Sequence, residues 1–151
     1  MIDAVVRRAG IDDVAELIVI EAQARAALVD ARGGARWLEE HRSIGAGWAE
    51  AVETRTVFAA VLVDAELDVV CGYLVLDVDG GIAVVDQVYV VPGARELGLG
   101  DGLLEAAVGE ARACGVAVLE GQALPGDRET KNLYERAGIT ARLITVSTRL
   151  V

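Results

Sequence analysis

The chain has 151 residues, which corresponds to one domain of ordinary size over residues 1–151. Its hydrophobic content of 54% excludes a disordered chain, and no apolar stretch reaches the roughly 18 residues that a membrane-spanning helix needs. Fourteen basic and twenty-four acidic residues give a net charge of −10, which disfavours nucleic acid as a partner and favours an amine. Because the N-terminus lacks a basic segment followed by an apolar core, we expect a cytoplasmic protein.

The N-terminal part of the chain is predicted to hold a strand and then a helix. Residues 3–8 have the character of a short strand, and apolar residues at helical spacing predict a helix over residues 14–28. Asp13, followed three residues later by Glu16, resembles a capping box at the start of this helix. The pair Gly33-Gly34 is expected to end it.

A second, weaker helical region contains both tryptophans and the single histidine. Trp37, His41 and Trp48 lie there. One histidine excludes a site built from several histidines, so we expect no bound metal and a histidine on the helix surface. Cys71 and Cys114 have no CxxC spacing and are expected to be reduced, buried thiols.

Three strands are predicted to follow one another in the middle of the chain. Residues 57–63, 69–76 and 82–91 are apolar and rich in β-branched side chains. Polar segments at 64–68 and 77–81 separate them, and the second contains an Asp-Gly pair, a strong hairpin signal. We therefore expect an antiparallel meander.

The C-terminal part is predicted to switch to a strand–helix–strand order. A helix is expected from about residue 99 to 114 and a strand over residues 116–119. Because a helical crossover makes the strands beside it parallel, we predict an α/β (α+β) fold with a mixed, mostly antiparallel central sheet and helices on both faces. A short helix between Asp127 and Gly138 and a closing strand over residues 139–150 complete the prediction.

A glycine-rich turn precedes the predicted helix at residue 99. Arg95, Gly98 and Gly100 place a cation and two residues without Cβ at the start of that helix. The unpaired N–H groups of a helix start carry partial positive charge, and glycine lets an anion come close to the backbone. We interpret the turn as a phosphate cradle. The alternative is that the glycines only shape a tight turn.

Two motifs resemble the GCN5-related N-acetyltransferase (GNAT) family. The turn Arg95-x-x-Gly98-x-Gly100, after the strand segment Val88-Tyr89-Val90-Val91-Pro92, resembles the acetyl-CoA pyrophosphate loop of that family. The segment Leu133-Tyr134-Glu135-Arg136-Ala137-Gly138 resembles its second motif, with Ile139 where phenylalanine is usual. The predicted elements also follow the order of the family, so the resemblance covers nearly the whole chain.

The resemblance implies direct transfer of an acetyl group from acetyl-CoA to a primary amine of a small molecule or peptide, without an acyl-enzyme. Main-chain groups of residues 88–90 would bind the pantetheine arm and polarise the thioester carbonyl. Tyr134 would protonate the leaving thiolate as general acid. The cofactor-binding residues implied are Val88, Tyr89, Val90, Arg95, Glu96, Leu97, Gly98, Leu99, Gly100, Asp101 and Asn132.

Asp86 is the candidate general base that takes the proton of the amine. Strand alternation places it on the face of Ile82, Val84, Val88 and Val90, and such apolar surroundings favour a carboxylate that takes up protons. Two alternatives stay open. A water relay can carry the proton instead, or the carboxylate only pairs with an arginine or caps a backbone group.

Several residues depart from the family pattern. Glu96 and Asp101 add negative charge beside the cradle, which weakens anion binding unless both point to solvent. Asp127 stands where asparagine is frequent and is expected to cap the following helix, with Asn132 as the substitute amide. These departures motivate an alternative function, a non-catalytic acyl-CoA-binding or regulatory module with the same fold.

The end of the chain and the tryptophans give the remaining expectations. Residues 139–151 suffice for one strand where the family usually has two, and an exposed sheet edge is often covered by a partner chain. We therefore expect a homodimer that uses the terminal strand. The resemblance also places Trp37 and Trp48 beside the amine acceptor, with core packing as the alternative.

Overall fold

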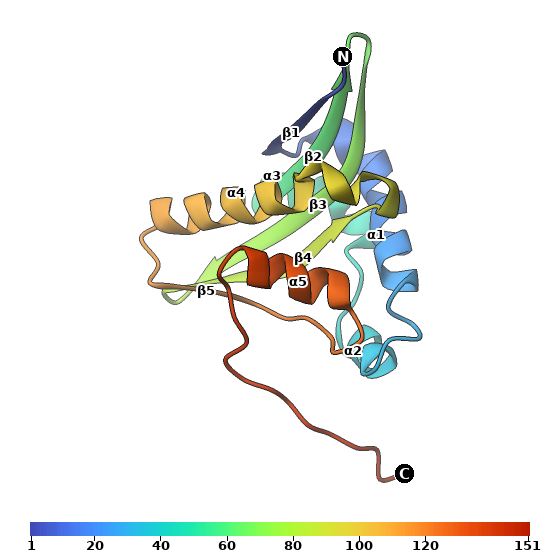
Figure 1. Cartoon of the computed structure of the whole chain (residues 1–151), viewed down its shortest axis with the longest axis vertical. Coiled ribbons are helices and arrows are strands. Elements are labelled where there is room, and N and C mark those ends of the chain that lie inside the picture. The colour runs from blue at the N-terminus through green and yellow to red at the C-terminus, as the bar shows by residue number, and fades with distance from the viewer.

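A central sheet of five strands organises the protein, which a computed structural model describes over residues 1–151. The strands lie side by side in chain order (Figure 1), and neighbours pair antiparallel except for β4 and β5, which are parallel. The predicted meander and its parallel neighbour are confirmed. The strands are β1 (Asp3–Arg8), β2 (Thr56–Asp64), β3 (Leu67–Asp79), β4 (Ile82–Val90) and β5 (Val118–Gly121).

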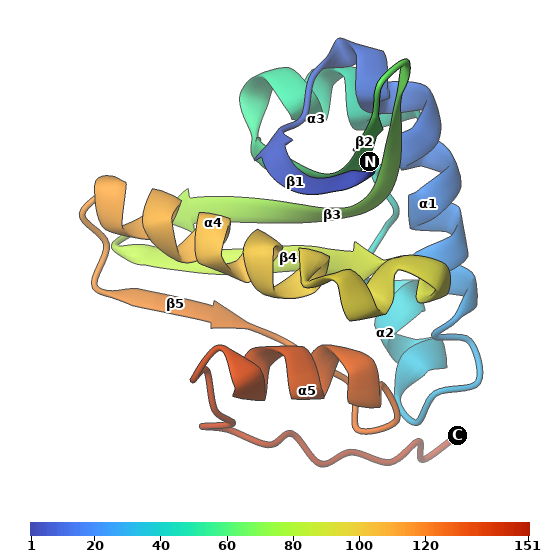
Figure 2. The same cartoon turned by 45° about the horizontal axis from the view of Figure 1, so that its top comes forward.

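Helices cover both faces of the sheet, as the sequence predicts. Figure 2 shows α4 and α5 on one face and α1 and α3 on the other. None of the helices combines the length and hydropathy that a membrane span requires. The helices are α1 (Val14–Ala26), α2 (Gly34–Glu40), α3 (Trp48–Thr54), α4 (Leu99–Ala113) and α5 (Arg128–Arg136), with 3-10 turns at Ile11–Asp13, Gly45–Gly47 and Pro92–Leu97.

Each face of the sheet has its own hydrophobic core. The α4 core is a cluster of 16 buried residues between the sheet and α4 with α5, and the α1 core is a cluster of 12 between the sheet and α1 with α3. Strand β3 serves both, because Leu74 and Leu76 belong to the α4 core and Tyr73 and Val75 to the α1 core. Each fully buried leucine contributes about 2 kcal/mol to folding.

Trp48 belongs to the α1 core and not to a substrate pocket. Its side chain is fully buried and packs edge-on against Tyr73, with ring centroids 5.4 Å apart. Trp37 lies on the short helix α2, where its ring stacks on His41 at 4.3 Å. The predicted second helix is therefore two helices, α2 and α3, separated by the turn that contains Gly45–Gly47.

Three residues around α1 have other roles than the sequence predicts. Asp13 accepts hydrogen bonds from the main-chain N–H of Gly10 and from Arg7 of β1, so it is not a capping box with Glu16. Glu16 instead accepts a hydrogen bond from the main-chain N–H of Val70 in β3. Gly33 does not end α1, which stops at Ala26; with a φ of 81° it precedes α2. Distant strands supply partners that a local pattern cannot reveal.

The predicted closing strand over residues 139–150 is wrong. This segment contains neither helix nor strand and leaves the body of the protein in Figure 1, with Leu143, Ile144 and Val146 almost fully exposed. Its composition suits a strand, but no other strand lies beside it to supply hydrogen bonds. Its one side-chain hydrogen bond joins Arg149 to Glu39 at 3.0 Å, and both of these side chains are mostly exposed.

The two cysteines are free thiols with different surroundings. Cys71 is buried in β3, and burial raises the pKa of its thiol. Cys114 is exposed at the end of α4, so the prediction of two buried thiols is wrong for this residue.

Candidate functional site

The pairing between the parallel strands β4 and β5 ends before β4 does. Their pairing stops at Val85 and Gly121, whereas β4 continues to Val90. Main-chain groups of residues 86–90 on the β5 side therefore have no neighbouring strand. Sites at the carboxyl ends of parallel strands commonly bind ligands.

A β-bulge lies on β4 at this point. Val75 of β3 pairs with Gln87 and Leu76 with Val85, so Asp86 between them has no partner. An extra residue reverses the alternation of side chains that follow it. Val85 and Val88 consequently both pack on the α4 core.

The bulge overturns the predicted surroundings of Asp86. Its strand face is not that of Val88 and Val90, which pack on the α4 core, and Ile82 and Val84 are exposed. The prediction of this strand face was wrong because side chains alternate regularly only along a strand without a bulge.

Asp86 shares an arginine with a second carboxylate. The Arg55 Nη2 atom lies 2.6 Å from Asp77 Oδ2 and 3.1 Å from Asp86 Oδ2. The hydrogen bond to Asp77 is the main reason that the pKa of Arg55 is raised, and the charges of both carboxylates add to it. The side chain of Asp86 is 36% exposed. Pairing with an arginine is thus present, and water has access to the carboxylate.

Tyr134 lies where β5 ends. Its side chain covers Gly121 so closely that a Cβ at this glycine would overlap the phenol. The residue is only 7% exposed, and its hydroxyl makes no hydrogen bond within the chain. Burial, and secondarily the negative charge of Asp127, raises the pKa of Tyr134. The phenol is therefore a protonated donor without a partner at neutral pH.

Helix α5 holds Tyr134 through a defined cap. Asp127 accepts hydrogen bonds from the main-chain N–H of Thr130 at 3.3 Å and from its hydroxyl at 2.7 Å, which confirms the predicted capping role. Leu133 and Tyr134 are the buried residues of the helix. Asn132 is exposed and makes no side-chain hydrogen bond, so the structure does not bring its amide to Tyr134.

The two glycines of the turn before α4 have different tasks. Gly98 has a φ of 76°, a conformation that favours glycine, and a Cβ there would meet nothing within 4 Å. A Cβ at Gly100 would lie 3.0 Å from Leu133 Cδ1, so this glycine lets α4 and α5 pack closely. The first N–H groups of α4 have no partner inside the helix and lie beside the open surface of Gly98. Gly98 thus shapes the turn and leaves it open, Gly100 allows helix packing, and phosphate binding at the turn stays a prediction.

The charged residues of the turn are arranged around its rim. Arg95 donates from Nε to the carbonyl of Val90 at 3.0 Å, and its guanidinium lies 5.6 Å from the ring centre of Tyr89. Asp101 pairs with Arg136 of α5 at 3.1 Å, and both side chains are more than half exposed. Glu96 is exposed. The two acidic residues thus point to solvent, which was the condition for tolerating them beside an anion.

The predicted site residues fall on two sides of the sheet. Val88, Val90, Leu99 and Tyr134 belong to or pack against the α4 core, whereas Tyr89 packs against the α1 core. Asp86 is not part of the α4 core. The exposed side chains of Glu96, Leu97 and Asp101 lie on the surface around the start of α4.

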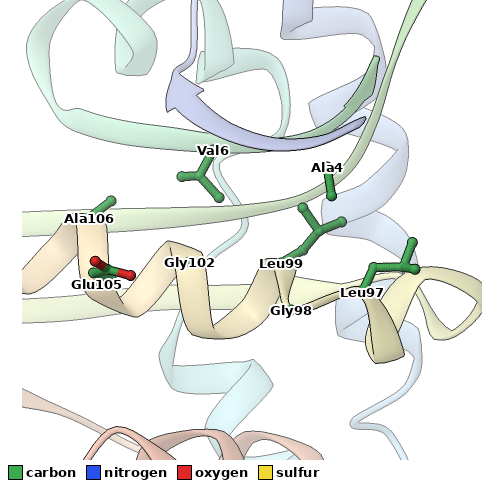
Figure 3. Close-up of a pocket in the computed structure, with 8 residues that line it drawn as sticks. All are labelled: Ala4, Val6, Leu97, Gly98, Leu99, Gly102, Glu105 and Ala106. Atoms are coloured by element: carbon green, nitrogen blue, oxygen red, sulfur yellow. The ribbon is translucent and has the colours of Figure 1, made fainter. Parts of the chain in front are cut away.

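A groove of about 460 Å³ flanks the start of α4 on the side of β1 (Figure 3). It shares Leu97, Gly98 and Leu99 with the glycine turn, and Tyr134 is not among its lining residues. Its one charged lining residue is Glu105. The groove therefore extends the accessible surface of the turn away from the phenol.

Sequence reasoning missed a polar network on the α1 side. Glu21 is 1% exposed, and its two carboxylate oxygens accept four hydrogen bonds. One of the donors is Gln87 of β4, whose own carbonyl oxygen accepts a hydrogen bond from the Tyr73 hydroxyl at 2.6 Å. The partners lie 14 to 66 residues apart in the chain, so no local motif reveals them.

The α2 region lies against the segment that follows β5. Trp37 Nε1 lies 3.4 Å from Gln122 Oε1, just after β5. A Cβ at Gly126 would lie 3.1 Å from the main-chain nitrogen of Arg32, so glycine permits this contact. The chain around residues 31–37 therefore packs against the segment between β5 and α5.

One protein family matches the sequence. The family described as the acetyltransferase (GNAT) family matches residues 20–139. No curated protein matches the sequence.

Solved structures show the same fold at low sequence identity. A mutant of the BH1408 protein from Bacillus halodurans is 19% identical, with a TM-score of 0.77 over 97% of this chain and 99% of that chain. An aminoglycoside N-acetyltransferase in complex with CoA is 16% identical, with a TM-score of 0.66 over 99% and 97%. A ribosomal-protein-alanine N-acetyltransferase from Brucella melitensis biovar Abortus 2308 is 17% identical, with a TM-score of 0.64 over 100% and 99%.

Proposed function

The chain belongs to the acetyltransferase (GNAT) family, and from this we propose that it transfers an acetyl group from acetyl-CoA directly to a primary amine of a small molecule or peptide. The observation that carries the proposal is Tyr134, a buried phenol without a hydrogen-bond partner at the point where β4 and β5 separate. The ring is buried, but the hydroxyl has no partner in the chain and is not sealed from solvent, so it is free to donate a hydrogen bond to a ligand.

The donors around the glycine turn fit a diphosphate. The first N–H groups of α4 are unpaired, Gly98 is open, and the acidic side chains of Glu96 and Asp101 face solvent. The unpaired edge of β4 at residues 88–90 fits an extended arm with amide groups. The aminoglycoside N-acetyltransferase of the same fold was solved with CoA, which further supports acetyl-CoA as co-substrate.

The proposed reaction moves one acetyl group and two protons. Acetyl-CoA supplies an activated thioester; the amine nitrogen bonds to the acyl carbon and the carbon–sulfur bond breaks. Main-chain N–H groups of β4 stabilise the charge that develops on the carbonyl oxygen. Asp86, directly or through water, takes the proton from the nitrogen, and Tyr134 gives its proton to the leaving thiolate. Asp86 then releases its proton to water and the Tyr134 phenolate takes one up, so both groups return to their starting states.

One observation favours the alternative, a non-catalytic acyl-CoA-binding or regulatory module. Asp86 shares Arg55 with Asp77, and a carboxylate engaged in this way is less available as a base. A module of this kind keeps the cradle and lacks turnover.

Titration calorimetry with acetyl-CoA and an assay of thiol release against a panel of amines test the proposal. We expect binding and amine-dependent release of CoA. Binding without turnover across a broad panel supports the module instead. Absence of acetyl-CoA binding contradicts both functions.

We also propose a homodimer in the cytoplasm, in which residues 141–151 add a strand to the sheet edge of a second copy. The exposure of Leu143, Ile144 and Val146 and the strand-like composition of the segment support this. Light scattering at micromolar concentration tests it. We expect a dimeric mass for the full chain and a monomeric mass for a chain that ends at Thr140; a monomeric full chain contradicts the proposal.

A further inference from the structure

We infer that Glu21 positions the part of the active site that receives the amine. It does so by fixing the turn before α3 against the part of strand β4 that carries the proposed base Asp86. The inference rests on the proposed acetyl transfer and adds a residue that neither motif contains. Glu21 comes from α1, contacts no reacting atom, and acts through the groups that it holds.

The carboxylate of Glu21 is saturated with hydrogen bonds. Oε1 accepts from the main-chain N–H of Gly45 at 2.8 Å and from Trp48 Nε1 at 3.1 Å. Oε2 accepts from the main-chain N–H of Ile44 at 2.9 Å and from Gln87 Nε2 at 2.7 Å. Two oxygens with about four lone-pair sites are thereby fully used. No other acceptor in the chain bonds to these two main-chain donors.

The four donors come from two parts of the chain that nothing else joins with side-chain hydrogen bonds. Three belong to residues 44–48, the turn and first residue of α3, and the fourth belongs to β4. Gln87 is the residue directly after Asp86, at the bulge. Glu21 therefore sets the distance between the turn and the part of β4 that carries the proposed base.

Tyr73 completes the arrangement by fixing the orientation of the Gln87 amide. Burial, and secondarily the charge of Glu21, raises the pKa of Tyr73, so the phenol stays protonated and donates to Gln87 Oε1. The carboxylate of Glu21 can only accept, so Nε2 must face it. Gln87 is held between a donor and an acceptor and has one orientation.

The position of the network on the α1 side predicts a selective effect. Glu21, Tyr73 and Gln87 lie on the face opposite to α4, α5 and Tyr134, which carry the proposed co-substrate site. Glu21 holds Gln87, which directly follows the proposed base Asp86, so a change at Glu21 should disturb use of the amine and leave acetyl-CoA binding intact. A residue that only contributes to stability would instead lower the amount of folded protein without separating the two substrates.

The variant Glu21→Gln tests the inference in the full chain. An amide has one oxygen for these donors and turns its NH₂ group towards two of them, so two hydrogen bonds to a charged acceptor are lost. We expect the KM for the best amine of the panel to rise roughly tenfold and the KM for acetyl-CoA to change by less than about twofold. The matched control is Glu50→Gln, because Glu50 is exposed on α3 and its carboxylate has no partner; both KM values should stay unchanged.

Amide hydrogen exchange gives a readout that does not depend on turnover. The main-chain N–H groups of Ile44 and Gly45 should exchange faster in Glu21→Gln than in Glu50→Gln, while the start of α4 exchanges at an unchanged rate. If Glu21→Gln does not fold, Gln87→Leu breaks only the link to β4 and should raise the KM for the amine with the same selectivity.

Two results overturn the inference. One is an equal rise of both KM values, or no rise, in the variant that folds. The other is unchanged exchange of Ile44 and Gly45 in Glu21→Gln. A wild-type chain that binds acetyl-CoA but turns over no amine contradicts the proposed function instead, and the exchange measurement then decides the inference alone.

Discussion

The two faces of the sheet treat their polar groups in opposite ways. On the α1 side, the buried charged residues are both held by hydrogen bonds: Asp13 accepts three and Glu21 accepts four. On the α4 side, the core is apolar, and the Tyr134 hydroxyl and the first N–H groups of α4 have no partner in the chain. The α1 side thus satisfies its own polar groups, whereas the α4 side leaves donors that the proposed co-substrate would use.

This difference assigns a physical role to each face. Saturated networks hold their members in one arrangement, because every alternative leaves a buried donor or acceptor unpaired. Donors without a partner in the chain have the opposite property, since they stay free to bind an acceptor from outside the chain. In the proposed function, the α1 side therefore provides a fixed wall, and the α4 side provides the groups that bind the co-substrate.

Replacing Tyr134 with phenylalanine should have the largest effect on this contrast. Tyr134→Phe removes the unpartnered hydroxyl and keeps the ring over Gly121, so stability should not fall. Without the proton donor we expect kcat to decrease by about 1000-fold, with acetyl-CoA affinity within about threefold of wild type. Steady-state kinetics and calorimetry measure the two quantities. Unchanged turnover in an active enzyme would show that Tyr134 is not the general acid.

The proposed base can be tested with a matched pair of carboxylates. Asp86 and Asp77 both pair with Arg55, and Asp77 has the shorter contact. We expect Asp86→Asn to lower kcat/KM by about 100-fold, less than the loss of the acid because water reaches this half-exposed position. Asp77→Asn should leave kcat/KM within about twofold of wild type. Equal losses in the two variants would mean that only the ion pair matters.

A Cβ added at Gly98 should weaken acetyl-CoA binding, whereas a Cβ added elsewhere in α4 should not. Gly98→Ala places a Cβ on a residue with a φ of 76°, which costs about 1 kcal/mol and displaces the start of α4. The Kd for acetyl-CoA should rise about fivefold, the equivalent of this energy. Gly109→Ala is the control in the same helix, because a Cβ there meets nothing within 4 Å and φ is helical. It should raise the free energy of unfolding by about 1 kcal/mol and leave Kd unchanged.

Features that depend on neighbouring residues could be predicted from the sequence. The strands of the meander, the helix after the glycine turn and the capping residue Asp127 all follow from local patterns, and the structure confirms them. The glycine turn and Tyr134 belong to motifs of this kind, which is why the α4 side could be interpreted before the fold was seen.

Features that depend on pairing between distant segments could not be predicted. The bulge at Asp86 follows from the register of β3 against β4, and the network of Glu21 joins residues up to 66 positions apart. The terminal segment fails for a related reason, because a strand-like composition forms no strand without an edge to pair with. The face with the distant contacts is thus the one that sequence patterns describe least well.

Acid should weaken the α1 side selectively, which is the smallest effect expected. The hydrogen bond from Arg7 lowers the pKa of Asp13, and the main-chain N–H of Gly10 adds to the effect. A carboxylate with a lowered folded-state pKa stabilises the protein above its ordinary pKa of about 4, and this contribution is lost as the pH falls through the folded-state value. Because Arg7 is 38% exposed, we expect Asp13→Asn to cost only about 1 kcal/mol of stability at neutral pH.

Urea unfolding at neutral and acidic pH measures this cost. The difference in the free energy of unfolding between Asp13→Asn and wild type should shrink in acid, whereas the exposed control Asp12→Asn should not change the free energy of unfolding at either pH. A difference that stays constant with pH would mean that Asp13 acts through packing and not through its charge.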